Sequence, residues 1–251
     1  MLDRPEYECS IGVVGKYTDV VDSYKSINEA LVHAGLSNNS LVKVSYIDAS
    51  RLGEAAVYDS LQGFDGVIIP GGFGSRGIEG KILAIRYLRE NRIPFLGICL
   101  GMQLAAVEVA RNKIGLEGAH SVEFDKLSKA PVIHLMESQR SVENLGGTMR
   151  LGAYPCNLVS GTIASHSYKA DKVSERHRHR YEFNNDYRPA FEENGVVFSG
   201  VSPDESLVEI IELKEHPFFV GCQFHPELKS SPMRPHPLFR EFVTASLKSK
   251  G

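Results

Sequence analysis

A short stretch near the middle of the chain, residues 97–103, most constrains the fold. It places Cys99 between two glycines, after the apolar run 93–96 and before the apolar segment 104–107. Flanking glycines permit the close backbone contacts of a sharp strand–turn–helix, with the middle residue held at a strained apex, whereas a buried strand gains nothing from them. A helix N-terminus also favours a thiolate. The stretch therefore predicts an elbow that presents a nucleophilic cysteine, although lone cysteines more often pack in a core.

Around the elbow, short apolar runs alternate with segments of helical periodicity. Buried strands are predicted at 9–15, 41–47 and 66–70, and helices at 27–34, 54–61 and 78–88, with Gly35 ending the first helix. Strand–helix–strand repeats join neighbouring strands through right-handed crossovers. We therefore expect an α/β fold built on a parallel sheet.

The second half of the chain has a different pattern. Residues 113–150 are rich in loop signals, and shorter strands are predicted at 148–152, 196–198, 207–211 and 218–222, before a last helix over 238–248. Turn signals such as 202–205 separate these strands. We expect them to be mostly antiparallel, either added to the same sheet or forming a small sheet of their own.

Composition excludes several classes of function. The net charge is −3 and the pI is near 6.3, which argues against nucleic acid or a membrane surface as a partner. No apolar run reaches the roughly 18 residues that a membrane-spanning helix needs. Four cysteines without CxxC spacing suit reduced thiols in the cytoplasm better than disulfides or a zinc site, and we expect no metal site.

A glycine-rich loop, residues 71–77, follows the predicted strand 66–70. Such a loop leaves backbone N–H groups free to face an anion. It fits neither the dinucleotide fingerprint nor the P-loop, which ends in Gly-Lys-Ser/Thr. Because loops at the carboxyl ends of parallel strands meet at one edge of the sheet, we expect this loop to supply an oxyanion-hole donor near Cys99.

A candidate base follows the last apolar strand. His225 and Glu227 are two residues apart, so an extended backbone points both side chains the same way, and Pro226 favours that conformation in His225. A carboxylate beside an imidazole fixes its tautomer, as in a nucleophile–base–orienter triad. With the Cys99 elbow upstream, His225 is the leading candidate base and Glu227 its partner.

The charged run 175–182 alternates arginine and histidine. Period-two alternation places the arginines on one strand face and His177 and His179 on the other. A metal site at the two histidines is disfavoured by the adjacent arginines, and a nucleic-acid patch lacks aromatic interleaving. A solvated edge strand is the ordinary explanation of such a run, but its three arginines also suit a carboxylate or phosphate ligand.

These motifs together resemble the class I glutamine amidotransferases and, within them, the glutaminase domains of CTP synthases. The similarity extends from about residue 9 to the end, over segments 11–17, 70–77, 97–103, 147–152, 175–182, 221–227 and 235–239. The elbow and the His-Pro-Glu triplet are common to all class I members, whereas the arginine–histidine run and the Arg-Gly end of the glycine loop are specific to CTP synthases. The resemblance implies a flavodoxin-like, open, mostly parallel sheet with helices on both faces and a few antiparallel strands.

The resemblance also implies a role for individual residues. Cys99 is then the nucleophile, His225 the base and Glu227 its orienting partner, with the backbone N–H groups of Gly72 and Leu100 forming the oxyanion hole. Residues expected to hold glutamine are Gly72, Leu100, Gly101, Met102, Gln103, Glu123 at the ammonium group and Arg180 at the carboxylate. Three arginines are expected near an effector or another domain, namely Arg76, Arg176 and Arg178.

Partners follow from the same resemblance. Residues 1–8 are expected to be a linker remnant and 9–251 the glutaminase domain, with an N-terminal synthetase domain outside this sequence. That domain binds ATP, UTP and Mg in the family, GTP is the allosteric activator, and the full-length enzymes form tetramers. The glutaminase domain itself is expected to hold L-glutamine and no cofactor.

The sequence departs from the family at three places, and two other functions stay open. Leu228 stands where phenylalanine usually follows the triplet, and segments 120–122 and 230–232 also differ. One alternative is a non-catalytic module that binds a nucleotide or a partner through the arginines. The other is a free-standing γ-glutamyl hydrolase, against which the pairing of Glu123 and Arg180 with free glutamine counts.

Overall fold

The computed structural model describes residues 5–16, 24–135 and 149–249. Residues 1–4 of the predicted linker, and residues 147 and 148 of a predicted motif, lie outside these ranges. The first strand begins at Tyr7 and already pairs there with Ser40. Tyr7 and Glu8, expected in the linker, are therefore strand residues.

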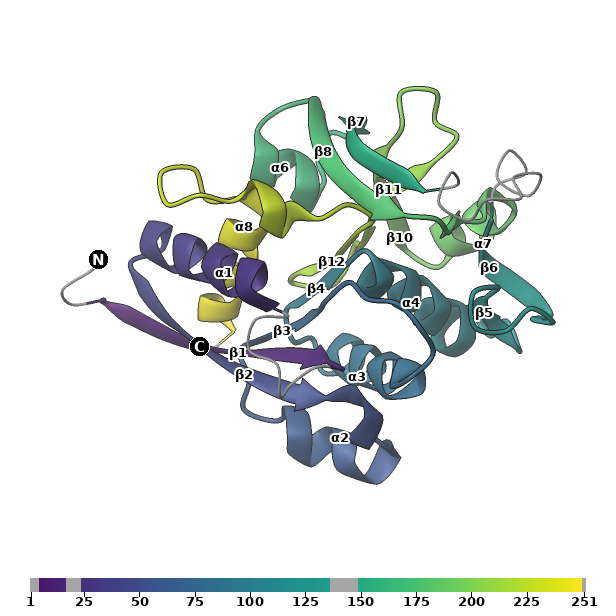
Figure 1. The fold of residues 1–251 in the computed structure, drawn as a ribbon, viewed down its shortest axis with the longest axis horizontal. Helices are drawn as coiled ribbons and strands as arrows, with labels where there is room; N and C mark the ends of the chain where they lie inside the picture. The colour runs from purple at the N-terminus through teal and green to yellow at the C-terminus, as the bar shows by residue number, and fades with distance from the viewer. Residues whose placement is uncertain (1–4, 17–23, 136–148, 250–251) are drawn as a thin grey trace.

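Five parallel strands form one half of a nine-stranded sheet. Their order across the sheet is β2-β1-β3-β4-β12. The bounds are β1 (Tyr7–Gly15), β2 (Ser40–Asp48), β3 (Gly66–Ile69), β4 (Phe95–Ile98) and β12 (Phe219–Cys222). The predicted parallel sheet is confirmed, and β12 is inserted beside β4 from the far end of the sequence (Figure 1).

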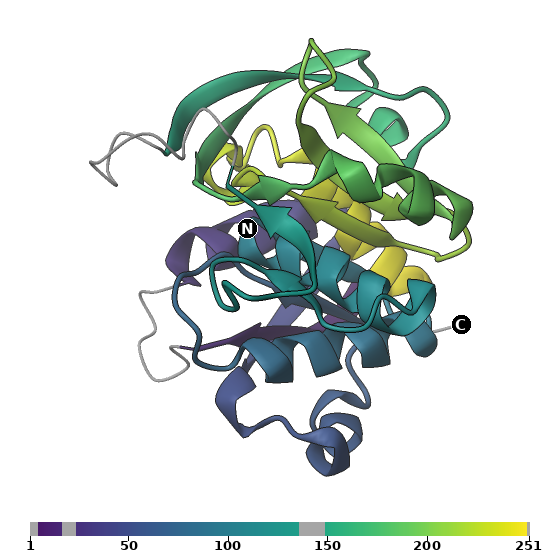
Figure 2. The same ribbon diagram turned by 90° about the vertical axis from the view of Figure 1, so that its right-hand side faces the viewer.

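Four antiparallel strands extend this sheet from β12 onward, in the order β11-β10-β7-β8. They are β7 (Arg150–Leu158), β8 (Lys172–His179), β10 (Val196–Val201) and β11 (Val208–Leu213). A separate small sheet holds β5 (Ala119–Ser121), β6 (Ala130–His134) and β9 (Glu182–Phe183). Figure 2 shows the antiparallel strands, in green, standing above the parallel half. Of the two expected arrangements, the predicted later strands adopt the first, since all of them join the main sheet, and the small sheet is built from strands that were not predicted.

Helices cover both faces of the parallel half (Figure 1). They are α1 (Lys25–Ser37), α2 (Glu54–Leu61), α3 (Ile78–Glu90), α4 (Leu100–Val109) and α8 (Pro237–Lys248). Val67 and Ile69 of β3 pack in a core with side chains of α2, α3 and α4, whereas Ile68 packs in a second core with α1 and α8, so alternate residues of one buried strand anchor opposite helix layers. Two short helices, α6 (Ile163–Tyr168) and α7 (Arg188–Glu193), lie against β10 of the antiparallel half.

One expectation about the elements was wrong, since helix α1 continues two residues beyond Gly35. A Cβ at Gly35 would lie 2.8 Å from the Ser40 carbonyl oxygen, so this glycine serves a close approach to β2 rather than a helix end. The segment 113–150, expected to be rich in loops, also contains two strands that were not predicted, β5 and β6, which are too short to produce a periodic signal.

Candidate active site

The elbow places Cys99 at the junction of β4 and α4 with φ +52° and ψ −102°. This lies in the left-handed half of backbone space, which is rare and strained for a non-glycine residue. A Cβ at Gly101 would lie 2.0 Å from the Ile69 carbonyl oxygen, and one at Gly97 would lie 2.8 Å from the Gly101 carbonyl carbon. The two glycines therefore let α4 sit against the sheet, and the predicted strained apex is confirmed.

The sheet register brings the base to the thiol. Strands β4 and β12 end side by side because Ile98 pairs with Cys222, and the Cys99 N–H donates to the Cys222 carbonyl at 2.7 Å. The His225 N–H donates to the Arg176 carbonyl of β8 at 2.8 Å. A Cβ on Gly71 would lie 3.0 Å from His225 Cε1 and 3.4 Å from Cys99 Cβ. Thiol, imidazole and glycine loop therefore meet at the carboxyl edge of the sheet, as expected.

Glu227 orients the imidazole, since its Oε1 lies 2.7 Å from His225 Nδ1. Burial lowers the pKa of His225, but hydrogen bonds to Cys99 and Glu227 and the charges of both raise it, to about 10 overall. The local backbone differs from the extended conformation that the sequence predicts. Pro226 opens a short 3-10 helix, Pro226–Lys229, because proline favours the first position of a helix. The His225 imidazole and the Glu227 carboxylate form their hydrogen bond across this turn.

The other cysteines show how unusual the surroundings of Cys99 are. Cys9, Cys156 and Cys222 are also buried and free. Burial raises the pKa of Cys156 to about 12 and that of Cys222 well above the ordinary value of a thiol. Of the four, Cys99 is the one hydrogen-bonded to an imidazole whose pKa is raised. This hydrogen bond distinguishes Cys99 from Cys156 and Cys222.

A cavity of about 130 Å³ opens beside the thiol. Five of the expected substrate residues line it, namely Gly72, Leu100, Gln103, Glu123 and Arg180, together with Cys99. Its remaining lining was missed by sequence reasoning and consists of Phe73, Met149, His179 and Tyr181. Gly101 and Met102 are not in this lining, because they face the sheet: a Cβ on Gly221 of β12 would lie 3.1 Å from Met102.

The lining of the cavity includes a carboxyl group, that of Glu123, and a guanidinium group, that of Arg180. Burial raises the pKa of Glu123, while the Gly74 N–H and the charges of Lys16 and Arg180 lower it. Lys16 was not anticipated: its ammonium group donates to the carbonyls of Phe73 and Gly74 and so fixes the glycine loop from below. A single lysine directly after the first strand gave no motif that could have revealed this contact.

The arginine–histidine run forms the exposed edge strand β8, and its predicted alternation is confirmed. Arg176 and Arg178 are exposed, whereas His177 and His179 are buried and hydrogen-bond to each other at 2.8 Å. Burial lowers the pKa of His177 to about 2 and that of His179 to about 3, so both rings are neutral. The Arg178 guanidinium lies 6.0 Å from the centre of the Phe73 ring.

Arg76 lies on the same side of the glycine loop. Its side chain is exposed and donates to the Lys16 carbonyl at 2.6 Å. The lining of the 130 Å³ cavity includes none of the three expected effector arginines. Arg76 belongs to the glycine loop and Arg178 lies over Phe73 of that loop, whereas Arg176 is opposite Ala153 in the β7–β8 pair. A second hollow of about 400 Å³ borders Cys99, His225 and Glu227 on this side and includes Arg178 and Leu228.

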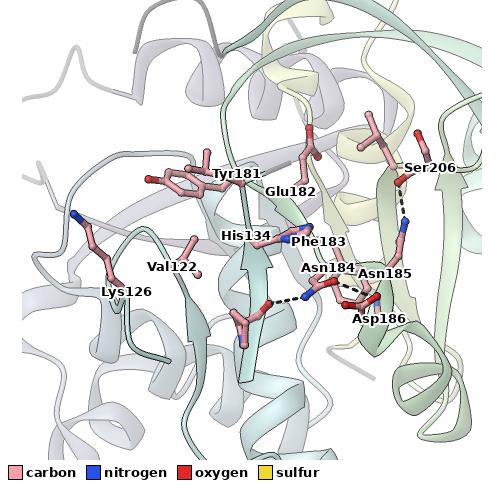
Figure 3. Close-up of a pocket in the computed structure, with 13 residues that line it drawn as sticks. Val122, Lys126, His134, Tyr181, Glu182, Phe183, Asn184, Asn185, Asp186 and Ser206 are labelled. Atoms are coloured by element: carbon pink, nitrogen blue, oxygen red, sulfur yellow. Dashed lines mark hydrogen bonds between the residues drawn. The ribbon is translucent and has the colours of Figure 1, made fainter. Parts of the chain in front are cut away.

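A further, larger hollow is separate from the thiol. It measures about 810 Å³ and lies beside β6 and β9, and its lining includes Lys126, His134, Asn184 and Asp186 (Figure 3). It shares Tyr181 with the smaller cavity, but Cys99, His225 and Glu227 do not line it. The site chemistry therefore belongs to the smaller cavity.

An α/β sheet with a strained cysteine, a carboxylate-oriented imidazole and free N–H groups at its carboxyl edge defines a cysteine-nucleophile acyl-transfer enzyme. The family model "Glutamine amidotransferase class-I" matches residues 19–245. The chain belongs to the class I glutamine amidotransferase family, which confirms the resemblance found in its motifs.

One curated relative and one solved structure are similar to this chain over nearly its whole length. The chain is 56% identical over 247 residues to a CTP synthase of Caldanaerobacter subterraneus. The matched segment covers 98% of this chain and 46% of that protein. It thus spans about half the length of the curated relatives it matches. The structure of the Trypanosoma brucei CTPS glutaminase domain with bound acivicin is 38% identical, has a TM-score of 0.89 and covers 96% of this chain and 94% of that one.

A more distant structure supports the fold alone. A glutamine amidotransferase from Thermotoga maritima is 13% identical with a TM-score of 0.53, and the match covers 96% of each chain. Among the helices of the described residues, none combines the length and apolar character that crossing a membrane requires.

Proposed function

We propose that this chain hydrolyses L-glutamine to glutamate and ammonia through a cysteinyl thioester. The observation that carries the proposal is the 130 Å³ cavity, whose walls bring Cys99 together with Glu123 and Arg180. A free amino acid has an ammonium group and a carboxylate, and these two side chains offer the opposite charge to each. The side-chain amide of the substrate then faces the thiol.

In acylation, the Cys99 sulfur attacks the amide carbon of glutamine and forms a tetrahedral intermediate. Gly72 and Leu100 line the cavity beside the thiol. We expect their N–H groups to receive the oxyanion, since Leu100 begins α4 and the first N–H groups of a helix have no intrahelical partner. His225, protonated at neutral pH according to its raised pKa, gives its proton to the departing nitrogen. Ammonia leaves and a γ-glutamyl thioester remains.

In deacylation, neutral His225 takes a proton from water as the water oxygen attacks the thioester carbon. The carbon–sulfur bond breaks, glutamate leaves, and the thiolate–imidazolium pair is restored. Glu227 holds the ring through Nδ1 at 2.7 Å and stabilises the imidazolium in both half-reactions. This division of roles requires no metal ion.

The proposal extends to the protein of which this chain forms a part. The curated relatives named CTP synthase are about twice as long as this chain. We infer a synthetase domain that binds ATP, UTP and Mg, uses the ammonia to convert UTP to CTP, and assembles as a tetramer. The four free cysteines suit a cytoplasmic location.

GTP activation is part of the same proposal. Arg76, Arg176 and Arg178 are exposed. Arg76 belongs to the glycine loop, and Arg178 lies over Phe73, which is 60% exposed. Guanidinium groups beside an exposed aromatic ring suit the phosphates and base of a nucleotide. A nucleotide bound there can act on the oxyanion hole through Gly72, the neighbour of Phe73.

The test is ammonia release from glutamine, measured with and without GTP, for the full-length enzyme and for this chain. Cys99→Ala is expected to lower the glutamine-dependent rate by at least about 10³-fold, because no other group forms the thioester, while the circular dichroism spectrum stays unchanged. The matched control is Cys9→Ala, which replaces a buried cysteine of β1 that does not line the cavity. We expect this variant to retain activity. Ammonia release by folded Cys99→Ala at the control rate contradicts the proposal.

A further inference from the structure

A chain of two amides and one backbone carbonyl lies behind Cys99. Gln223 follows β12 directly, and its side chain has no exposed surface. Its Nε2 lies 3.9 Å from Cys99 Sγ, and its Oε1 accepts a hydrogen bond from Gln103 Nε2 at 3.2 Å. Gln103 Nε2 also donates to the Tyr181 carbonyl at 3.0 Å. The contacts connect the strand end that carries Arg180 with the nucleophile.

This chain has a fixed direction. The Tyr181 carbonyl can only accept a hydrogen bond, so the side chain of Gln103 must turn its NH₂ group toward it. The second N–H of that group then meets Gln223, which must answer with its oxygen. The NH₂ group of Gln223 is left to face Cys99 Sγ, so Gln223 offers the sulfur a donor. The thiol also has an acceptor for its own proton, the Arg178 carbonyl oxygen at 4.0 Å.

The backbone holds both ends of this contact. The Gln223 N–H donates to the Glu209 carbonyl at 2.8 Å, and the Cys99 N–H donates to the Cys222 carbonyl at 2.7 Å. Gln223 lines neither of the two hollows that border Cys99. Its amide therefore does not face the substrate itself, and it can act on the reaction through the Cys99 sulfur or through Gln103, which lines the smaller hollow.

We propose that Gln223 is a positioning residue whose amide N–H holds the Cys99 sulfur as a thiolate, with Gln103 fixing the direction of that amide. An N–H donor stabilises a charged acceptor more than a neutral one, so the contact favours the reactive form of the thiol. The inference rests on the proposed function in taking Cys99 as the nucleophile. Other titratable groups that act on Cys99 are His225 beyond β12, Lys81 of α3 and Cys222 of β12.

The test is the rate at which iodoacetamide alkylates Cys99 at different pH values, followed by mass spectrometry of the Cys99 peptide. Gln223→Met keeps the length of the side chain and removes the donor. We expect the pH midpoint of alkylation to rise by about one unit, a tenfold loss of reactivity below the midpoint. Gln223→Glu keeps the shape and places oxygen against the sulfur, and we expect an equal or larger rise.

Glu212→Gln is the matched control. Glu212 is a buried polar residue of the adjacent strand β11 and accepts from the N–H groups of Ile163 and Ala164, so its replacement costs stability without touching the sulfur. The midpoint of this variant is expected to match the wild type. An unshifted midpoint in folded Gln223→Met or Gln223→Glu overturns the inference and leaves only a packing role. Because alkylation needs no glutamine, a failure of the proposed glutaminase activity shows separately in the ammonia assay.

Discussion

The two halves of the nine-stranded sheet bury different kinds of side chain. In the parallel half, β3 and β4 bury only apolar residues and glycine. In the antiparallel half, β11 buries Glu209 and Glu212, and β8 buries Glu175, His177 and His179. The parallel half therefore holds the Cys99 elbow by close packing. The antiparallel half instead holds β8, the strand that leads to Arg180, by paired charges and hydrogen bonds.

The largest effect is expected from breaking the charge pairing of the antiparallel half. Arg150 Nη2 lies 2.8 Å from Glu209 Oε1, and its Nη1 lies 3.4 Å from Glu182 Oε1. Arg150→Met leaves two buried carboxylates without their cation, so we expect the free energy of unfolding to fall by about 3–5 kcal/mol. Urea denaturation at neutral pH measures this change.

The control for Arg150 lies on the paired strand. Arg176 is opposite Ala153 of β7 and is exposed, so Arg176→Met is expected to change stability by less than about 0.5 kcal/mol. If Arg150→Met unfolds no more easily than Arg176→Met, buried charge does not hold this half and the contrast between the halves is lost.

A smaller effect is expected from disturbing the packing of the parallel half. Gly101→Ala drives a methyl group to within 2.0 Å of the Ile69 carbonyl oxygen, so α4 must move away from β3. We expect a loss of about 1–3 kcal/mol in unfolding free energy and, because Cys99 begins this helix, slower alkylation of the thiol. Gly53→Ala, where the new Cβ meets nothing within 4 Å, should cost less than about 1 kcal/mol. Equal losses in the two variants would mean that close packing does not position the elbow.

The smallest effect is expected at Lys81, a charged residue that is buried in the otherwise apolar parallel half. Lys81 of α3 is 1% exposed and lies within the apolar half. Burial and, less strongly, the charge of Lys16 lower its pKa and Cys99 raises it, to about 7 overall. Lys81→Met removes a poorly solvated ammonium group, and we expect a gain of at least about 1 kcal/mol in unfolding free energy below pH 7.

The gain from Lys81→Met must depend on pH in one direction. Below the folded pKa of about 7 the lysine is charged in both states, so the full cost of burying it is present. Between that pH and the ordinary pKa of 10.5 only the unfolded state stays charged, so the wild type gains stability as pH rises. Urea midpoints of the two proteins should therefore converge from pH 6 to pH 10. A constant or widening gap would show that Lys81 is buried without cost.

The sequence predicted the elements whose signal is local. The elbow at Cys99 depends on glycines two residues away, and the His225–Glu227 pair on a spacing of two. Such short-range patterns predict the local structure correctly because the tertiary contacts of the folded chain favour the same local structure. The prediction of an extended His225–Glu227 backbone was wrong in detail, since Pro226 starts a turn, yet the pair still forms.

The residues that sequence reasoning missed share a different property. Lys16 acts on carbonyls of the glycine loop, Gln223 on a thiol, and Tyr181 on Gln103 through its backbone, and each partner is distant in sequence. Strands β5 and β6 are likewise defined by pairing and not by period. Contacts of this kind depend on which strands become neighbours, and no spacing in a single sequence encodes that.

The insertion of β12 beside β4 has a consequence for the order of events in folding. Phe95 pairs with Phe219, so the strand that precedes the nucleophile must wait for one made near the end of the chain. Closing so long a loop is entropically costly and slow. During synthesis Cys99 emerges long before His225, and the thiol stays without its base until the last strand docks. The proposed glutaminase activity therefore waits until the residues up to His225 have been made and β12 has docked.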